Sequence, residues 1–280
     1  MSTIKIHIMH TGQVRVAQDL PFGGEHTNLL KASGLLTPAS KKLWLPVSAY
    51  LIEHPKGLIL VDTGWSREMS PDGTFDKKAQ IKHLGSHILY HVNQGLVPKG
   101  EAVVEQLATL GYAPEDLDYV LMTHLDCDHA SGLHSVATAK NILVSRDELL
   151  SAPHQKPRYQ EKWWKDIPLT AFDWTEKEGP FQHSYDLFGD GSIQMIHIPG
   201  HADGLFAVKV TNGDGNFVLL ASDAGYAEKS WKELILPGIS LDKDKQMTSL
   251  KWVKAQSELA NCIQVIANHD TAIKPQVIEL

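Results

Sequence analysis

Short runs of apolar residues recur along this chain, and most of them have the length of a buried strand. They occupy residues 4–9, 47–53, 57–61, 119–122, 141–145, 192–198, 205–210, 217–221 and 263–267. Apolar runs of about four to eight residues between turn signals are typical of strands that are largely buried. Apolar residues at helical spacing appear instead in 81–89, 101–110 and 245–259. The pattern therefore predicts an α/β protein with several buried strands.

Three longer segments lack a clear strand pattern. Residues 10–45 contain several Gly and Pro residues and are predicted to form a long loop over the functional site. Residues 65–98 are predicted to form an inserted helical cap rather than a strand layer, and the aromatic-rich segment 151–184 is predicted to cover the core. Because no linker or low-complexity tract divides the chain, we expect a single domain over residues 1–280, with two similar halves that share one site.

The composition limits the classes of partner. The 280 residues carry a net charge of -7, which argues against general binding to nucleic acids or to membrane surfaces. No apolar run approaches the roughly 20 residues needed to span a bilayer. The first residues alternate between polar and apolar and lack the apolar core of a signal peptide. Since the two cysteines imply no disulfide framework, we expect a cytoplasmic protein, and the sequence leaves its oligomeric state open.

The highest density of potential catalytic or metal-binding side chains lies directly after one of the predicted strands, in residues 123–129. This segment contains two histidines, His124 and His129, and two aspartates, Asp126 and Asp128. A loop at the end of a strand is a common location for functional residues in α/β proteins. Imidazole and carboxylate groups both bind divalent ions such as zinc, iron and manganese. A solvated polar loop would contain the same residue types, so this segment alone leaves two interpretations open.

Three further strand ends favour the metal-binding interpretation, because each is also followed by a potential ligand. These ligands are His201, Asp223 and His269. Asp62 closes another apolar run, but an aspartate in that position usually accepts hydrogen bonds from backbone amides, and we assign it that structural role.

At these residues the chain resembles the metallo-β-lactamase-fold hydrolases, and within them the N-acyl homoserine lactonases that degrade quorum-sensing signals. The resemblance rests on the segments 62–64, 123–132, 199–201, 222–226 and 268–270. It implies an αββα four-layer sandwich, in which two mixed sheets are flanked by helices and the site lies at the edge between the sheets. It also implies two divalent metal ions, with zinc as the default.

The ligands that the resemblance implies form two sets of three and one shared carboxylate. They are His124, Asp126 and His201 for one ion, Asp128, His129 and His269 for the other, and Asp223 between the two. Hydroxide held between the ions would attack a carbonyl carbon, and Asp128 would carry the proton to the departing alkoxide. Tyr226 matches a lactonase-like position and would donate a hydrogen bond to the substrate, or else form part of the pocket wall.

One residue departs from the family motif H-x-H-x-D-H, because Asp126 stands where the second histidine is expected. With three carboxylates, two divalent ions and a hydroxide, the charges of the centre sum to zero, one positive charge fewer than with histidine. We therefore expect a less positive centre, with iron or manganese as alternatives to zinc. A carboxylate here also resembles the di-iron branch of the superfamily, but that branch carries a flavin domain for which this chain has no room.

The expected activity is metal-dependent hydrolysis of a small-molecule substrate, the lactone ring of N-acyl homoserine lactones or of a related lactone. The alternatives are hydrolysis of another ester, a thioester or a phosphodiester at the same site, and a weakly metallated binding or regulatory protein. Since no arginine stands near the ligands in the sequence, a neutral ester is favoured over a phosphodiester. An apolar channel for an acyl tail is expected from residues 65–98 and from the aromatic residues of 159–181, with Phe75 and Trp164 as test positions.

Overall fold

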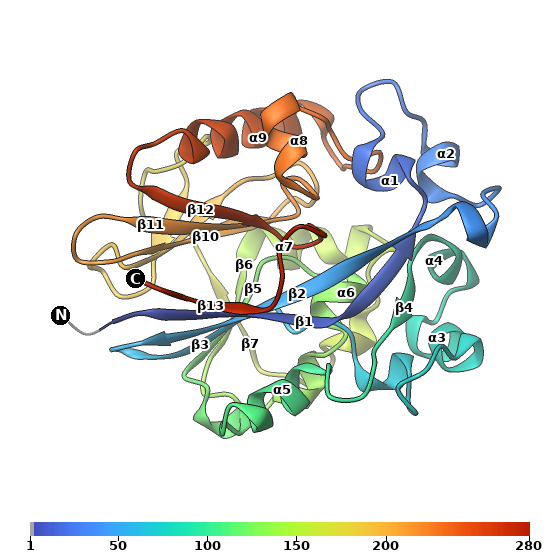
Figure 1. The fold of residues 1–280 in the computed structure, drawn as a ribbon, viewed down its shortest axis with the longest axis horizontal. Helices are drawn as coiled ribbons and strands as arrows, with labels where there is room; N and C mark the ends of the chain where they lie inside the picture. The colour runs from blue at the N-terminus through green and yellow to red at the C-terminus, as the bar shows by residue number, and fades with distance from the viewer. Residues whose placement is uncertain (1–2) are drawn as a thin grey trace.

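Two sheets packed face to face form the centre of the molecule. The computed structural model describes residues 3–280. Helices α8 and α9 lie over the outer face of one sheet, and α5 lies on the outer face of the other (Figure 1). This is the αββα sandwich of two mixed sheets that the resemblance implies, so the predicted fold class is confirmed.

The first sheet has eight strands and is mixed. In spatial order its strands are β13 (Gln276–Glu279), β1 (Lys5–Val16), β2 (Leu43–His54), β3 (Gly57–Val61), β5 (Tyr119–Met122), β6 (Ile142–Ser145) and β7 (Leu169–Phe172), and β4 (Gln94–Leu96) also pairs with β1. Strands β3, β5, β6 and β7 run parallel to one another, whereas β13, β1, β2, β3 and β4 pair in antiparallel fashion.

The second sheet has five strands. In spatial order they are β12 (Cys262–Ala267), β11 (Phe217–Ser222), β10 (Phe206–Thr211), β9 (Ile193–His197) and β8 (Ser184–Asp186). Only β11 and β12 are parallel to each other.

The helices are short, apart from α9. The α-helices are α1 (Asp19–Phe22), α2 (Leu29–Ser33), α3 (Lys77–Leu84), α4 (His87–Val92), α5 (Val103–Thr109), α6 (Cys127–Ala130), α7 (Arg146–Ser151), α8 (Glu228–Glu233) and α9 (Lys243–Ser257). The 3₁₀ helices are η1 (Ala39–Lys41), η2 (Arg67–Met69), η3 (Pro114–Asp116), η4 (Leu133–Val136), η5 (Ala152–His154) and η6 (Glu161–Trp163). No helix within residues 3–280 is long and apolar enough to cross a bilayer.

The strands have apolar side chains on both faces because each sheet is covered on both sides. In β2, Tyr50 and Ile52 pack in the core between the sheets, while Leu51 packs on the outer side with the residues of α5. In β11, Val218 points into the same inter-sheet core, while Leu219 packs with residues of α8 and α9. Alternate residues of one strand therefore enter different cores, which explains the continuous apolar runs in the sequence.

Two predicted segments differ in detail from the structure. Residues 10–45 are not one long loop, because β1 continues to Val16 and the short helices α1, α2 and η1 follow. The segment 65–98 contains the helices η2, α3 and α4, as predicted, but it also contributes a strand: β4 pairs with β1, with Gly95 opposite Val14. The interpretation of this segment as a cap separate from the strand layers is therefore wrong in part.

Candidate metal centre

The central motif lies where the chain leaves β5. The short helix α6 begins at Cys127, and Asp126 is its N-cap residue. His124 lies in the connecting loop, and Asp128 and His129 lie in the first turn of α6. Since all four predicted ligands in this segment are buried, the alternative interpretation of the segment as a solvated polar loop is excluded.

The remaining three ligands follow strands of the second sheet. Asp223 comes directly after β11, His269 follows β12, and His201 follows β9 through a tight turn. That turn requires glycine, because Gly200 has φ +133° and an added Cβ would lie 2.2 Å from the backbone nitrogen of Gln246 in α9. The close approach of α9 thus fixes the direction in which His201 enters the site.

The structure brings all seven predicted ligands into one buried cluster. Three sets have ligand atoms close enough to share an ion: His124, Asp126 and His201; Asp128, His129 and His269; and His124, His129 and Asp223. The carboxylate of Asp223 lies between the first two sets. Its Oδ1 is 3.4 Å from Nε2 of His129, and its Oδ2 is 3.4 Å from Nε2 of His269 and 3.5 Å from Nε2 of His201.

The donor atoms of this cluster fit a divalent metal ion. Nε2 of His124 and Oδ1 of Asp223 are buried and have no hydrogen-bond partner among the described residues. Burial and the charge of the neighbouring His129 lower the pKa of His124 to about 4, so this imidazole is neutral near pH 7 and keeps a lone pair for a ligand. Buried carboxylates need compensating positive charge, and a divalent ion supplies it.

Hydrogen bonds from outside the cluster orient two of its imidazoles. Nδ1 of His129 lies 2.8 Å from Oδ2 of Asp62, and Nδ1 of His269 lies 2.8 Å from the backbone oxygen of Pro46. Asp62 also accepts hydrogen bonds from the backbone nitrogen and hydroxyl of Thr123. Asp62 therefore has the structural role predicted for it, and both imidazoles turn Nε2 toward the cluster.

Comparison with known proteins places this fold and cluster in a family. A family model described as the metallo-beta-lactamase superfamily matches residues 43–259, more than three quarters of the chain. The chain belongs to the metallo-β-lactamase superfamily.

Several relatives within this superfamily are lactonases. N-acyl homoserine lactonase AttM of Rhizobium radiobacter is 28% identical over 233 residues, which cover 81% of this chain and 82% of AttM. An N-acyl homoserine lactonase of Bacillus thuringiensis is 30% identical over 223 residues, covering 78% of this chain and 79% of the relative.

Solved structures share the fold. A structure of an N-acyl homoserine lactone hydrolase, with the product N-hexanoyl-L-homoserine at its catalytic metal centre, matches with a TM-score of 0.76 and 22% identity, and the match covers 99% of this chain and 100% of that one. The dizinc quorum-quenching lactonase AidC matches with a TM-score of 0.63 and 14% identity, covering 99% of this chain and 94% of AidC.

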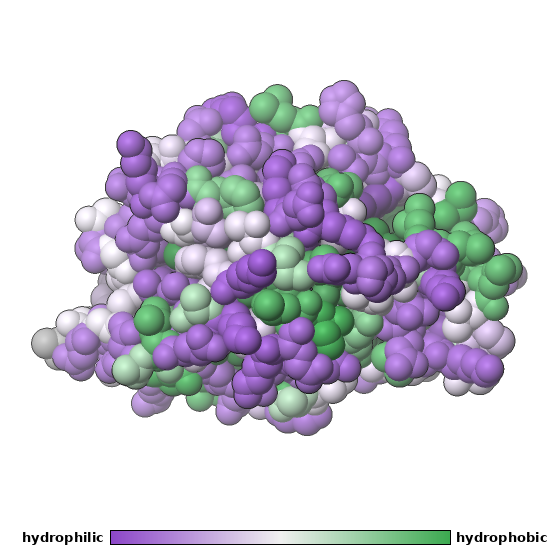
Figure 2. All heavy atoms as spheres, turned by 90° about the horizontal axis from the view of Figure 1, so that it is seen from above, coloured by the Kyte–Doolittle hydropathy of each residue, from purple (hydrophilic) through white to green (hydrophobic). Residues whose placement is uncertain are grey.

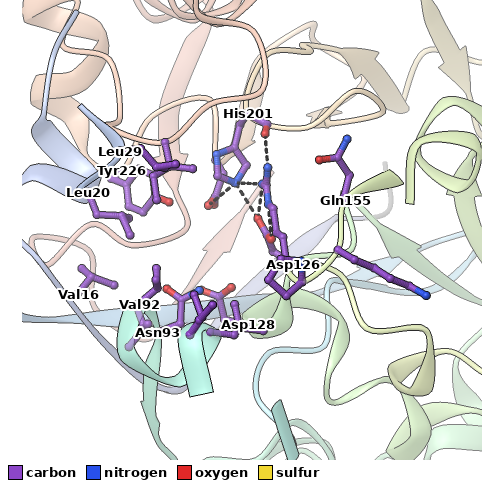
Figure 3. Close-up of a pocket in the computed structure, with 18 residues that line it drawn as sticks. Val16, Leu20, Leu29, Val92, Asn93, Asp126, Asp128, Gln155, His201 and Tyr226 are labelled. Atoms are coloured by element: carbon purple, nitrogen blue, oxygen red, sulfur yellow. Dashed lines mark hydrogen bonds and ion pairs between the residues drawn. The ribbon is translucent and has the colours of Figure 1, made fainter. Parts of the chain in front are cut away.

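One side chain in this metallo-β-lactamase site was missed by the sequence analysis. Arg158, in the connection between η5 and η6, donates from Nε to Oδ1 of Asp126 at 2.6 Å and from Nη2 to Oδ2 at 2.5 Å. Its Nη1 donates to the backbone oxygen of His201, and its Nη2 lies 2.8 Å from Nε2 of that histidine. Dashed lines in Figure 3 mark these interactions around Asp126 and His201.

Arg158 corrects two expectations drawn from the sequence. Burial alone would raise the pKa of Asp126, but the charge and hydrogen bonds of Arg158 lower this pKa well below its ordinary value, so the carboxylate stays charged. The guanidinium returns the positive charge that Asp126 was expected to remove, so the site is not less positive than one with histidine at this position. The expectation that no arginine lies near the ligands is also wrong.

Tyr226 lies beside the cluster, as its sequence position predicts. Its ring stacks on the imidazole of His269, with centroids 4.8 Å apart and an interplanar angle of 18°. Burial, followed by the charge of Asp223, raises the pKa of Tyr226 well above its ordinary value, so its hydroxyl remains a proton donor. Both the wall role and the donor role that the sequence left open are consistent with this position.

A cavity of about 360 Å³ opens onto the cluster (Figure 3). Its polar wall includes Asp126, Asp128, Arg158, His201, Asp223 and Tyr226, and its apolar wall includes Val14, Val16, Leu20, Leu29, Ile88 and Val92. Leu29 and Ile88 are 68% and 58% exposed, and Figure 2 shows hydrophobic surface at the end of the molecule where α2 lies. The cavity therefore connects the charged cluster to an apolar mouth.

The lining of the cavity differs in part from the predicted acyl channel. Residues of α4 contribute to it, as predicted for the segment 65–98, but β1, α1 and α2 also supply apolar wall residues, together with Pro157 and Ile239. The prediction that aromatic residues of 159–181 line the channel is wrong. Phe75 lies outside the cavity, where its ring packs edge-on against Trp44, and Trp164 packs with Tyr159.

Proposed function

We propose that this protein is a metal-dependent lactonase that opens the ring of N-acyl homoserine lactones or of a related lactone with an apolar tail. The observation that carries the proposal is a buried cluster of histidines and aspartates at the polar end of a cavity whose other wall is aliphatic. An amphiphilic substrate would place its ester at the cluster and its acyl chain against the aliphatic wall. The lactonases named among the relatives support the same substrate class.

We assign the metal to the cluster as follows. Of the two ligand sets expected from the sequence, the set of Asp128, His129, His269 and Asp223 is the proposed catalytic one, with zinc as the default ion and iron or manganese as alternatives. When bound, a divalent ion supplies a Lewis acid for the ester carbonyl and a means of activating water near neutral pH.

Two side chains are proposed to act on the substrate itself. The protonated hydroxyl of Tyr226 would donate a hydrogen bond to the ester carbonyl or to the acyl amide, and so stabilise negative charge that develops on oxygen. Asp128 lies on the cavity wall, from which its carboxylate would take a proton from the attacking water and pass it to the departing alkoxide. In a lactone this alkoxide stays attached to the acyl group, and the product is a hydroxy acid.

A neutral ester remains favoured over a phosphodiester although an arginine lies in the site. Four of the five N–H groups of Arg158 are directed at Asp126 and His201. This guanidinium is therefore already committed and has little capacity left to bind phosphate oxygens. For the compartment we propose the cytoplasm, because Cys127 and Cys262 are both free thiols.

Proton release on ring opening tests the proposed function. The metal-free protein would be loaded in turn with zinc, manganese and iron(II) and mixed with N-hexanoyl and N-decanoyl homoserine lactone. We expect release of one proton per lactone opened, at a rate far above that of the metal-free protein. If no metal-loaded form releases protons from either lactone, the lactonase assignment is wrong, and hydrolysis of a thioester and a phosphodiester panel would then be measured.

A further inference from the structure

The Arg158 guanidinium occupies the neighbourhood in which the first of the two expected ions would bind. It approaches both carboxylate oxygens of Asp126 within 2.6 Å and lies 2.8 Å from Nε2 of His201. Asp126 and His201 are two of the three groups in that ligand set, and the third is His124. Two thirds of the set is therefore already bound to a side-chain cation.

While Nε2 of His201 makes this contact, it cannot also bind a metal ion. Nε2 of His201 offers either one lone pair or one proton, depending on the tautomer. With the lone pair it accepts the hydrogen bond from Arg158, and with the proton it donates to Oδ2 of Asp126 at 2.9 Å. Neither arrangement leaves a lone pair on Nε2 for a metal ion, and a guanidinium stays protonated at any pH that the fold would survive.

The arginine is held in place by a second layer of buried groups. Its guanidinium lies over the ring of Tyr159, 5.3 Å from the centroid, and the Tyr159 hydroxyl donates to Glu148 at 2.5 Å. Glu148 in turn accepts hydrogen bonds from the backbone nitrogens of Leu125, within the motif, and of Gly204, three residues after His201. Arg158 is thus positioned by the same network that positions the ligands, which would resist its displacement by an ion.

The second ligand set is different. Nε2 of His269 lies 3.5 Å from Oδ2 of Asp128 and 3.4 Å from Oδ2 of Asp223, and no lysine or arginine pairs with these carboxylates within residues 3–280. Nε2 of His129 also lies 3.2 Å from the amide nitrogen of Asn268, an uncharged donor whose hydrogen bond is weaker than that of a guanidinium. Among the described residues, these two carboxylates pair only with imidazoles and with no side chain of fixed positive charge, so a divalent ion could still compensate them.

The geometry points to a centre with a single metal ion. We infer that one divalent ion binds to Asp128, His129, Asp223 and His269, and that the Arg158 guanidinium takes the place of the second ion beside Asp126 and His201. This inference refines the proposed function, because it specifies the metal content of the same site. It can be tested without any substrate, so its failure and the failure of the lactonase proposal are separate results.

Zinc content provides the test. The purified full chain would be saturated with zinc, freed of loosely bound metal on a desalting column, and analysed by mass spectrometry. We expect one zinc per chain in the wild type and in R158K, which keeps the positive charge, and about two in R158Q, which releases Asp126 and His201. R146Q serves as the control, because Arg146 forms an exposed pair with Asp173 and should leave one zinc per chain. Two firmly bound zinc ions in the wild type would overturn the inference.

Substitution of single histidines keeps the test decisive even if R158Q does not fold. Zinc affinity would be measured by competition with a chromogenic chelator for H201A and H269A. If only the second set binds metal, H269A weakens zinc binding by at least about 10–100-fold, whereas H201A retains one zinc with an affinity within about threefold of the wild type. Equal losses in the two variants would contradict the single-ion centre.

Discussion

Replacement of Asp62 by asparagine isolates the contribution of one buried carboxylate to the metal centre. Asp62 accepts hydrogen bonds from the backbone nitrogen of Thr123 at 2.9 Å, from the hydroxyl of the same residue at 2.8 Å, and from Nδ1 of His129 at 2.8 Å. Asparagine tolerates the positive φ of 57° at this position, so the backbone is retained. It offers one oxygen instead of two, however, and at least one buried donor loses its acceptor.

The size of the effect follows from these contacts. An unpaired buried donor costs about 1–3 kcal/mol, and the free energy of unfolding of the metal-free protein should fall by about that amount. If the remaining oxygen stays with Thr123, His129 loses the partner that orients its ring. Loss of such an outer partner typically weakens metal binding by about 10–100-fold, which is about 1.4–2.7 kcal/mol.

Two measurements separate the effects on folding and on metal binding. Urea unfolding in the presence of a chelator gives the stability, and competition with a chromogenic chelator gives the zinc affinity. Asp118→Asn is the matched control, because Asp118 also accepts a backbone hydrogen bond, from Leu58, but lies at the end of β5 away from the site. The reasoning is refuted if Asp62→Asn is destabilised but binds zinc as tightly as this control.

Three further changes follow from the site, and a fourth serves as a control. Tyr226→Phe removes the hydroxyl donor and should lower kcat/KM for the lactone by about 100-fold while zinc content stays constant. An unchanged kcat/KM would show that Tyr226 only forms part of the pocket wall. Gly200→Ala should lower the unfolding free energy by about 2–6 kcal/mol, since its Cβ would meet Gln246 and its φ is positive; urea unfolding measures this, and a wild-type midpoint would contradict the close approach of α9. Leu20→Trp should reduce kcat/KM for the decanoyl lactone relative to the hexanoyl lactone by about tenfold or more, because it fills the apolar end of the cavity. Phe75→Ala should leave this ratio unchanged, since Phe75 lies outside the cavity, and the opposite pattern would show that the tail binds elsewhere.

The positions of the seven predicted ligands could be inferred from sequence because they depend on local patterns and one general rule of topology. Each ligand segment follows an apolar run that forms a strand, namely β5, β9, β11 or β12. In a sandwich of two such sheets, strand ends from both sheets meet at one edge. Local hydrophobicity therefore predicts the strands, and the fold class predicts that the residues after them converge.

The apolar wall of the cavity depended on features that the sequence conceals. β1 changes register between His10 and Gln13, around Gly12 with φ +101°, so its alternation is interrupted and its second half resembles a loop. Val14 and Val16 nevertheless lie on this second half and line the cavity. The three-residue strand β4 likewise exists only through its pairing with β1, which no local pattern of residues reveals.

Arg158 could not be predicted from local pattern, but it could have been expected from charge. It lies 32 positions from Asp126, in a segment without helical or strand periodicity. The sequence did show a carboxylate where the family motif has a neutral imidazole, and a buried carboxylate requires a compensating cation. By itself, the charge of Asp126 makes the centre less positive than a neutral histidine would. The ion pair of Asp126 with Arg158 has no net charge, so the centre has the same net charge as with a neutral histidine. A histidine at position 126 would leave the buried guanidinium of Arg158 without its counter-ion. Restoring the histidine of the family motif at position 126 would therefore also require a neutral residue at position 158.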